Sequence, residues 1–264
     1  MKILSLSSTT DNKNLLSRLT TLFKGGFLIL IFLKKGYIFY IIYIVKIYNK
    51  DENMKFKNVY FINGNAYAGK STITSLLAKK YNGIHCEENY HDIKLQELDK
   101  NIFPALTYTR DLKDWRDFVT RTPDEYEKWI NDVTIECMKL ELEILNEISN
   151  TDKLIFVDTN IPVEILKEIS DIDHVLIMLT DPNISVNRFF DRPDKEKQFL
   201  YQLLLKEENK EEALENFKNC LKRINSKENY QMFLNSGFNV LIKDETRKIE
   251  ETLEIVEKLF KLKL

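Results

Sequence analysis

The chain has 264 residues, of which 44% are hydrophobic and 30% charged, a composition typical of a globular protein with a sizeable core. A formal net charge of -2 and a pI near 6.1 provide no positive field for a polyanion, which argues against nucleic acid as a main partner. Three cysteines, Cys86, Cys137 and Cys220, form no CxxC pair, so a disulfide framework and a zinc site are both disfavoured and a reducing cytosol fits best.

Composition changes near residue 54. Apolar runs at 27–33 and 37–45 flank Lys34, Lys35 and Gly36, and together are about as long as a bilayer span. The two central lysines nearly cancel the gain from inserting these runs into a membrane, and no small-residue cleavage site follows them. We predict a cytoplasmic protein that starts at Met54, with residues 1–53 as a dispensable extension; a membrane anchor through residues 27–45 is the alternative.

From Met54 onward, apolar runs alternate with helical patterns. Residues 56–62 predict a buried strand that ends at the Asn63-Gly64 turn, and residues 70–81 predict the helix that follows it. The later runs are mostly apolar rather than alternating, which indicates a parallel sheet covered on both faces. We therefore predict one α/β domain from 54 to 264, with further strands at 83–88, 153–159, 174–180 and 238–244 and a long helix at 124–149.

The stretch "GNAYAGKS" at residues 64–71 fits the pattern G-x-x-x-x-G-K-[ST]. Its two glycines let the backbone turn so that successive N–H groups face phosphate oxygens, and the positive end of the next helix adds to the attraction. Lys70 is expected to reach the β- and γ-phosphates, and the Ser71 hydroxyl to bind magnesium. The predicted nucleotide-binding residues are Gly64, Asn65, Ala66, Tyr67, Ala68, Gly69, Lys70, Ser71 and Thr72.

Other motifs narrow the class of nucleotide-binding protein. Asp158, at the end of the third predicted strand, is expected near magnesium. Thr159 stands where a mechanical ATPase usually carries a glutamate, while D-x-x-G after Asp158, N-K-x-D and the ABC-transporter signature are all missing. A phosphoryl transferase that uses ATP and Mg²⁺ on a small acceptor remains.

At this point the chain resembles the P-loop small-molecule kinases, over residues 56–261. The resemblance implies a three-layer α/β P-loop NTPase fold, with a five-stranded parallel sheet of order 2-3-1-4-5 and a helical lid. In "VLIMLTDPNISVNRFFDRPDKEKQ", Arg188 and Arg192 look like the lid arginines that neutralise charge on the transferring group. The alternative is that both arginines cap a helix end and face water.

The second predicted strand leads into "HCEENYHD", which is similar to the D-x-F-Y segment of uridine-kinase-like enzymes. Glu87 takes the place of the acid that faces the acceptor hydroxyl, Tyr90 takes the place of the tyrosine, and Asn89 replaces the usual aromatic residue. Glu87 is therefore the predicted catalytic base, with Glu88 and Asp92 as alternatives. The histidines His85 and His91 are predicted to be spectators, because neither has a partner at metal-ligand spacing.

Residues 108–129 interleave arginines with aromatic residues where this family builds its acceptor pocket. Guanidinium groups beside aromatic faces suit a flat ring that bears an anionic or hydroxylated group. We predict that Arg110, Arg116 and Arg121, together with Glu88, bind the acceptor. An amphipathic helix with buried aromatic residues and arginines paired to nearby aspartates is the alternative.

The predicted function is phosphorylation of a small hydroxyl- or phosphate-bearing molecule, such as a nucleoside or nucleotide. A kinase of an antibiotic or sugar-nucleotide is the second candidate, because "INGNAYAGKS" is also similar to the loop of chloramphenicol-phosphotransferase-like proteins. A nucleotide-binding regulator tethered through residues 27–45 is the third.

Overall fold

The computed structural model describes residues 28–31, 40–43, 56–191 and 195–262, and the chain divides into two compact units, Met1–Met54 and Lys55–Leu264. In the first unit, strands β1 (Leu28–Ile31) and β2 (Tyr40–Tyr43) pair antiparallel. The rest of the apolar segment 27–45 lies outside the described residues. None of the helices in the described part of the chain is long and apolar enough to cross a membrane.

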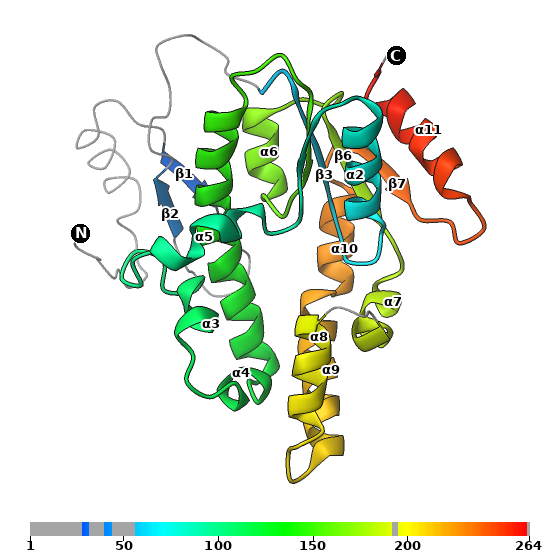
Figure 1. The fold of residues 1–264 in the computed structure, drawn as a ribbon. Coiled ribbons are helices and arrows are strands. Elements are labelled where there is room, and N and C mark those ends of the chain that lie inside the picture. The colour runs from blue at the N-terminus through cyan, green and yellow to red at the C-terminus, as the bar shows by residue number, and fades with distance from the viewer. Residues whose placement is uncertain (1–27, 32–39, 44–55, 192–194, 263–264) are drawn as a thin grey trace, which may run out of the picture. The chain divides into compact units, whose positions relative to one another are not determined.

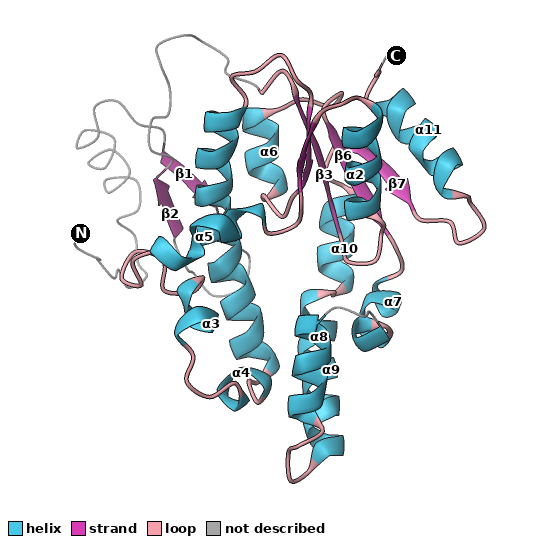
Figure 2. Cartoon of the chain, in the orientation of Figure 1, coloured by secondary structure: helices cyan, strands magenta, loops and turns pink. Residues whose placement is uncertain are grey.

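The second unit is built on a five-stranded parallel sheet (Figures 1 and 2). Its strands are β3 (Val59–Gly64), β4 (Ile84–Cys86), β5 (Ile155–Asp158), β6 (Val175–Leu179) and β7 (Asn239–Ile242). They lie side by side as β4-β5-β3-β6-β7. Counted along the second unit, this is the order 2-3-1-4-5, so the predicted fold class is confirmed.

Helices cover both faces of the sheet, which explains why β5 and β6 are buried along their whole length (Figure 2). On one face, α2 (Lys70–Lys80) and α11 (Ile249–Leu259) enclose a core that includes Ile73, Leu77 and Val256. Figure 1 shows α5 (Pro123–Ile148) and α6 (Val163–Ile169) on the other side of the strands. The order of layers is thus helix, sheet, helix.

The long helix predicted at 124–149 is confirmed as α5. It starts with a capping box, in which the Thr122 hydroxyl accepts from the Glu125 backbone N–H and the Glu125 carboxylate accepts from the Thr122 N–H, and Pro123 occupies the first turn. Three short elements precede it: η1 (Tyr90–Glu97), α3 (Thr107–Asp111) and α4 (Arg116–Val119).

A second, aromatic core lies beyond the carboxyl ends of the strands, among the helices drawn in the lower part of Figure 1. Phe118, Tyr126 and Phe217 are buried in it, and the ring centroids of Phe118 and Trp129 are 5.0 Å apart, edge to face. Besides α4 and α5, it is formed by α7 (Pro182–Asn187), η2 (Phe189–Asp191), α8 (Lys195–Leu204) and α9 (Lys210–Ile224). The remaining helix, α10 (Lys227–Leu234), leads back to β7.

Candidate active site

The "GNAYAGKS" stretch joins the central strand β3 to α2, and its two glycines are required by the geometry. Gly64 has a φ of 131°, and a Cβ at this position would lie 1.8 Å from the Met178 carbonyl oxygen. Gly69 is the N-cap of α2 with a φ of 97°. Side chains are disfavoured at such φ values, so both positions need glycine. The strand, glycine loop and helix therefore occur in the predicted order.

Side chains from neighbouring elements hold the loop in place. Asn65 Nδ2 donates to the Thr180 carbonyl at 2.7 Å, and the Thr180 N–H donates to Asn65 Oδ1 at 2.8 Å. Ser185 Oγ donates to the Ala66 carbonyl at 2.8 Å, and the Tyr67 hydroxyl donates to the Arg188 carbonyl. The end of β6 and the helix α7 thus fix the loop before any ligand binds.

Lys70, Ser71 and Asp158 meet at the carboxyl ends of the neighbouring strands β3 and β5. Ser71 Oγ donates to Asp158 Oδ2 at 2.5 Å, and Lys70 Nζ lies 3.8 Å from Asp158 Oδ1. Lys70 is only 6% exposed and Asp158 only 1%. Within the described part of the chain, Asp158 Oδ1 is buried and accepts no hydrogen bond. An unsatisfied buried carboxylate oxygen is costly and indicates a missing partner.

Burial raises the pKa of Asp158, and the negative charge of Glu88 adds to the rise. The Lys70 ammonium and the Ser71 hydroxyl act in the opposite direction without cancelling the rise. A cation beside Oδ1 would favour the ionised carboxylate.

This oxygen and the Ser71 hydroxyl fit Mg²⁺, which prefers oxygen ligands and is commonly held by one or two protein groups together with substrate phosphates. No group of three His, Cys, Asp or Glu side chains among the described residues is arranged to hold a metal by itself. The protein side of a magnesium site would thus consist of Ser71 and Asp158, and their role as metal ligands stays a prediction.

The N-terminus of α2 suits an anion. Its N-cap, Gly69, has no side chain to accept a hydrogen bond, and no acidic residue lies in the first turn. The free N–H groups and the positive end of the helix dipole lie next to the buried Lys70. Phosphate oxygens would satisfy both the N–H groups and the lysine.

A cavity of about 120 Å³ opens beside the glycine loop, between α2 and the segment that follows β7. Its wall is apolar at Ile73, Met178, Leu241 and Ile249, and polar or charged at Lys243, Asp244, Arg247 and Thr252. Apolar walls with a few polar groups suit a flat heterocycle.

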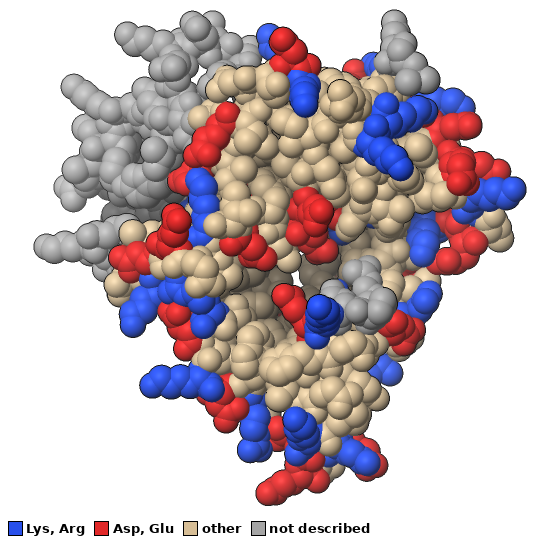
Figure 3. Space-filling model, viewed as in Figure 1, with Lys and Arg blue, Asp and Glu red and all other residues tan. Residues whose placement is uncertain are grey.

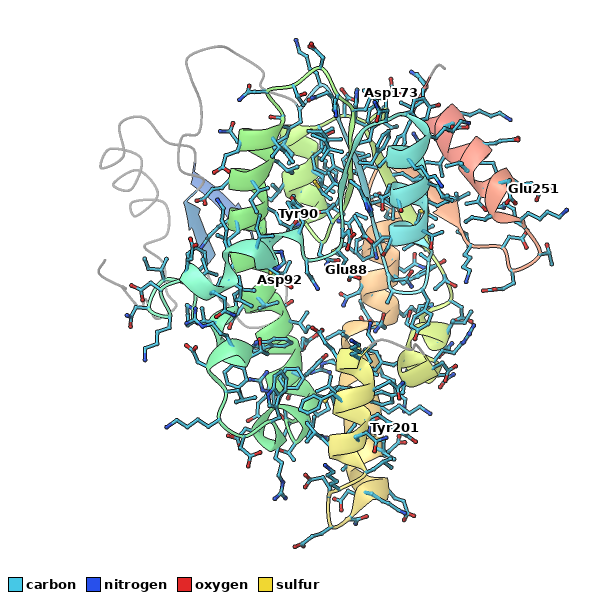
Figure 4. The ribbon with its side chains drawn as sticks, viewed as in Figure 1. Glu88, Tyr90, Asp92, Asp173, Tyr201 and Glu251 are labelled. Carbon is cyan, nitrogen blue, oxygen red and sulfur yellow. The ribbon has the colours of Figure 1, made fainter. Side chains whose placement is uncertain are left out.

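The acidic loop after β4 lies at the same edge of the sheet, and Figure 3 shows that this face of the molecule is hollowed near its middle. Figure 4 shows Glu88 in this central region, at the end of the sheet opposite Asp173. The Glu87 side chain is 79% exposed, with Oε1 3.9 Å from His85 Nδ1, whereas the charge of Glu88 acts on Asp158. Glu88 is exposed as well, and the role of either glutamate as base stays a prediction.

Two of the predicted acceptor arginines already have partners within the chain. Arg110 donates through Nε and Nη2 to Asp111 and through Nη1 to two backbone carbonyls, of Leu95 and Leu98. Arg116 forms a bidentate pair with Glu207, with both N···O distances 2.9 Å. The Arg110–Asp111 pair agrees with the alternative expectation of arginines paired to nearby aspartates, whereas Arg116 pairs with a glutamate far away in the chain. The acceptor role of both arginines stays a prediction.

Arg121 is different, because its guanidinium carbon lies over three rings, 4.2 Å from the centroid of Tyr108, 5.1 Å from Phe118 and 5.3 Å from Trp129. Its Nη1 is buried and has no hydrogen-bond partner among the described residues. Of the three arginines, Arg121 is therefore the one that we retain for acceptor binding.

Only one of the two predicted lid arginines lies within the described residues. Arg188 caps α7, is about half exposed, and places Nε 3.2 Å from Asp191 Oδ2. Arg192 lies outside the described residues. Charge neutralisation by either arginine stays a prediction.

A cluster of buried polar residues at this edge of the sheet was not predicted from the sequence. His91, expected to be a spectator, is 3% exposed and contacts the buried Glu141 of α5, which also binds Thr159. A signal was present, because Glu141 interrupts an apolar face of α5 that includes Cys137, Leu140 and Ile144. A glutamate at such a core position predicts a specific partner.

No protein-family model matches the chain, and a search of curated proteins finds no relative of it. Among solved structures, the chain is similar to the deoxyadenosine kinase of M. mycoides, a structure with bound dATP. The match has a TM-score of 0.37 and 16% sequence identity, and covers 77% of this chain and 100% of the kinase chain. From its own sheet order and glycine loop, the second unit is a P-loop α/β fold.

Proposed function

We propose that the protein is an ATP- and magnesium-dependent phosphotransferase that acts on a small hydroxyl- or phosphate-bearing molecule. One observation carries this proposal. Lys70, Ser71 and Asp158 converge at the strand ends beside the N-terminus of α2, and within the described part of the chain the buried Asp158 Oδ1 accepts no hydrogen bond. Phosphate groups and a divalent cation supply the charges and ligands that this arrangement lacks.

The roles of the donor-side residues follow from their positions. Lys70 binds the β- and γ-phosphates, while Ser71 and Asp158 hold the cation. A magnesium ion held there would supply positive charge that offsets the negative charge of the transferring phosphoryl group. The base of the nucleotide fits the cavity beside Ile73 and Leu241.

On the acceptor side, a carboxylate at the sheet edge takes the proton of the attacking hydroxyl and orients that hydroxyl in line with the phosphate. We assign this role to Glu88 rather than to Glu87, because both side chains are exposed and the charge of Glu88 is the one that acts on Asp158. Arg121 with its aromatic neighbours suits a flat acceptor with a polar edge, which favours a nucleoside or nucleotide.

The test is to incubate the protein with magnesium-ATP and a panel of nucleosides, nucleotides, sugars and aminoglycoside or phenicol antibiotics. ADP release and the mass of each acceptor are followed. We expect acceptor-dependent ADP release and the mass gain of one phosphoryl group. Tight ATP binding without turnover for any acceptor would favour a nucleotide-binding regulator, and an antibiotic that is phosphorylated best would favour the antibiotic-kinase alternative.

Matched variants assign the roles. Lys70→Ala should lower turnover by about a hundredfold or more, because it removes a group that stabilises the transition state, whereas Lys79→Ala, exposed on the same helix, should have no effect. Glu88→Gln should lower turnover by about a hundredfold with ATP binding intact, and Glu87→Gln should lower it far less. The opposite result for the two glutamates would return the catalytic role to Glu87.

A further inference from the structure

Glu141 is a buried carboxylate whose two oxygens bind different segments of the chain. It lies on α5 and is 2% exposed. Its Oε1 lies 3.0 Å from His91 Nδ1, and its Oε2 accepts a hydrogen bond of 3.0 Å from Thr159 Oγ1. An ionised carboxylate is an acceptor only, so donors at both oxygens satisfy it.

The first of these segments is the acidic loop that carries Glu87 and Glu88. Two residues that follow these glutamates bind Glu141, because the Tyr90 hydroxyl donates to its backbone carbonyl at 3.2 Å and His91 contacts its side chain. His91 Nε2 in turn lies 3.1 Å from Cys137 Sγ, one turn earlier on α5. The loop is thus attached to α5 directly after its acidic residues.

The second segment is the strand end that carries Asp158. Thr159 is the next residue, 1% exposed, and its Oγ1 also accepts from the Ile161 N–H at 3.0 Å. Asn63 Nδ2 donates to the Ile161 carbonyl at 2.7 Å, and Asn63 directly precedes Gly64 of the glycine loop. The contact with Glu141 therefore reaches the segment that orders both Asp158 and the start of the phosphate loop.

Stability alone gives no reason for a glutamate at this position. A buried charge pays a large desolvation cost, and well-packed apolar residues in place of buried ionic groups are often neutral or stabilising. A leucine would continue the apolar face formed by Leu140, Ile144 and Leu145 on α5. What a leucine cannot do is fix two polar segments at a defined spacing.

We propose that Glu141 is a positioning residue that holds the acidic acceptor loop in register with the strand end that carries Asp158. This inference rests on the proposed function. The carboxylate that takes the acceptor proton and the carboxylate that holds the metal act on the two sides of the same phosphoryl group, so their spacing governs in-line attack. The Glu141 carboxylate acts through His91 and Thr159, whereas Tyr90 binds the backbone carbonyl of the same residue.

The chain offers a matched control for the test. Glu136 is a second buried glutamate of α5, 7% exposed, and its Oε2 accepts from the Leu106 N–H at 2.8 Å. The same substitution at the two positions thus replaces a buried carboxyl group on the same helix. Only Glu141 binds the acceptor loop and the Asp158 strand end.

Glu141→Gln should lower kcat by about tenfold to a hundredfold while the KM for ATP changes by less than about twofold, because misplacement slows chemistry without removing nucleotide contacts. Glu136→Gln should leave kcat within about twofold of the unsubstituted protein. Thr159→Val should resemble Glu141→Gln, and Thr159→Ser, which keeps the hydroxyl, should restore most of the loss. If Glu141→Gln impairs folding, this threonine pair carries the test. Unchanged kcat in folded Glu141→Gln, or an equal fall in Glu136→Gln, would overturn the proposal.

Amide hydrogen exchange separates this proposal from the proposed function, because it needs no turnover. Glu141→Gln should increase exchange both in residues 87–97 and in residues 158–161, and Glu136→Gln should increase it near Leu106 instead. If exchange in the two segments does not rise together, the positioning role is wrong even in an active kinase. If it rises in a chain that phosphorylates no acceptor, the proposed function fails while the coupling between the segments stands.

Discussion

At Gly64, the constraint comes from packing as well as from the backbone. An added Cβ would lie 1.8 Å from the Met178 carbonyl oxygen of the neighbouring strand β6, at a φ of 131°. Gly237 has a similarly positive φ of 85°, but nothing lies within 4 Å of its added Cβ. Alanine substitutions at the two positions therefore distinguish the cost of a steric clash from the cost of backbone strain alone.

We expect Gly64→Ala to lower the free energy of unfolding by about 3 kcal/mol or more, because a clash with backbone adds to the strain of positive φ. Gly237→Ala should cost about 1 kcal/mol, from backbone strain alone. Urea unfolding of the two variants measures both values. Equal losses would show that β6 moves away from Gly64 at little cost.

The buried Asp158 predicts how magnesium binding depends on pH. Burial raises the pKa of this carboxyl, and a protonated carboxyl cannot bind the cation. As pH falls through the raised pKa, protons compete with magnesium for the Asp158 carboxylate. An ordinary aspartate, with a pKa of about 3.9, is still ionised at that pH.

Below the raised pKa, the magnesium-dependent part of nucleotide affinity should weaken by about tenfold per pH unit. Calorimetric titration of ADP, with and without magnesium, across about pH 5 to 8 tests this dependence. Asp158→Asn is the control, because it leaves protonation of the nucleotide itself unchanged. Parallel pH curves for Asp158→Asn and the unsubstituted protein would contradict the prediction.

At the scale of elements, most strands were predictable because they are short apolar runs between turn residues. The runs at 153–159 and 174–180 became β5 and β6, both fully buried, and the central position of β3 followed from the resemblance to P-loop kinases. The glycine loop was predictable for a related reason, since its chemistry lies within eight consecutive residues, 64–71.

Long-range pairing was not predictable from the sequence. Arg116 pairs with Glu207, and the Glu141 carboxylate contacts both His91 and Thr159. The partners in these contacts are far apart in the chain. Local spacing carries no information about such partners, so the arginines of residues 108–129 all resembled acceptor ligands. The structure separates them, because Arg110 and Arg116 bind acidic side chains while Arg121 lies over aromatic rings.

At the scale of the whole molecule, the described core and the candidate site lie within Lys55–Leu264. The described core residues run from Val59 to Phe260, and the residues assigned to phosphate, cation and acceptor lie between Gly64 and Arg188. The strand β3 is central in the sheet and begins five residues after Met54. A chain that starts at Met54 thus contains every described element of the second unit.

We therefore expect a protein that starts at Met54 to unfold in one cooperative transition and to bind magnesium-ATP with a Kd within about twofold of that of the full chain. Its midpoint of thermal unfolding should rise on adding magnesium-ATP, because a ligand that binds only the folded state stabilises it in proportion to the logarithm of its concentration. Circular dichroism melts and calorimetry on the two forms provide the comparison. If the shorter form unfolds without cooperativity or loses ATP affinity by more than about tenfold, residues 1–53 contribute to the folded second unit and are not dispensable.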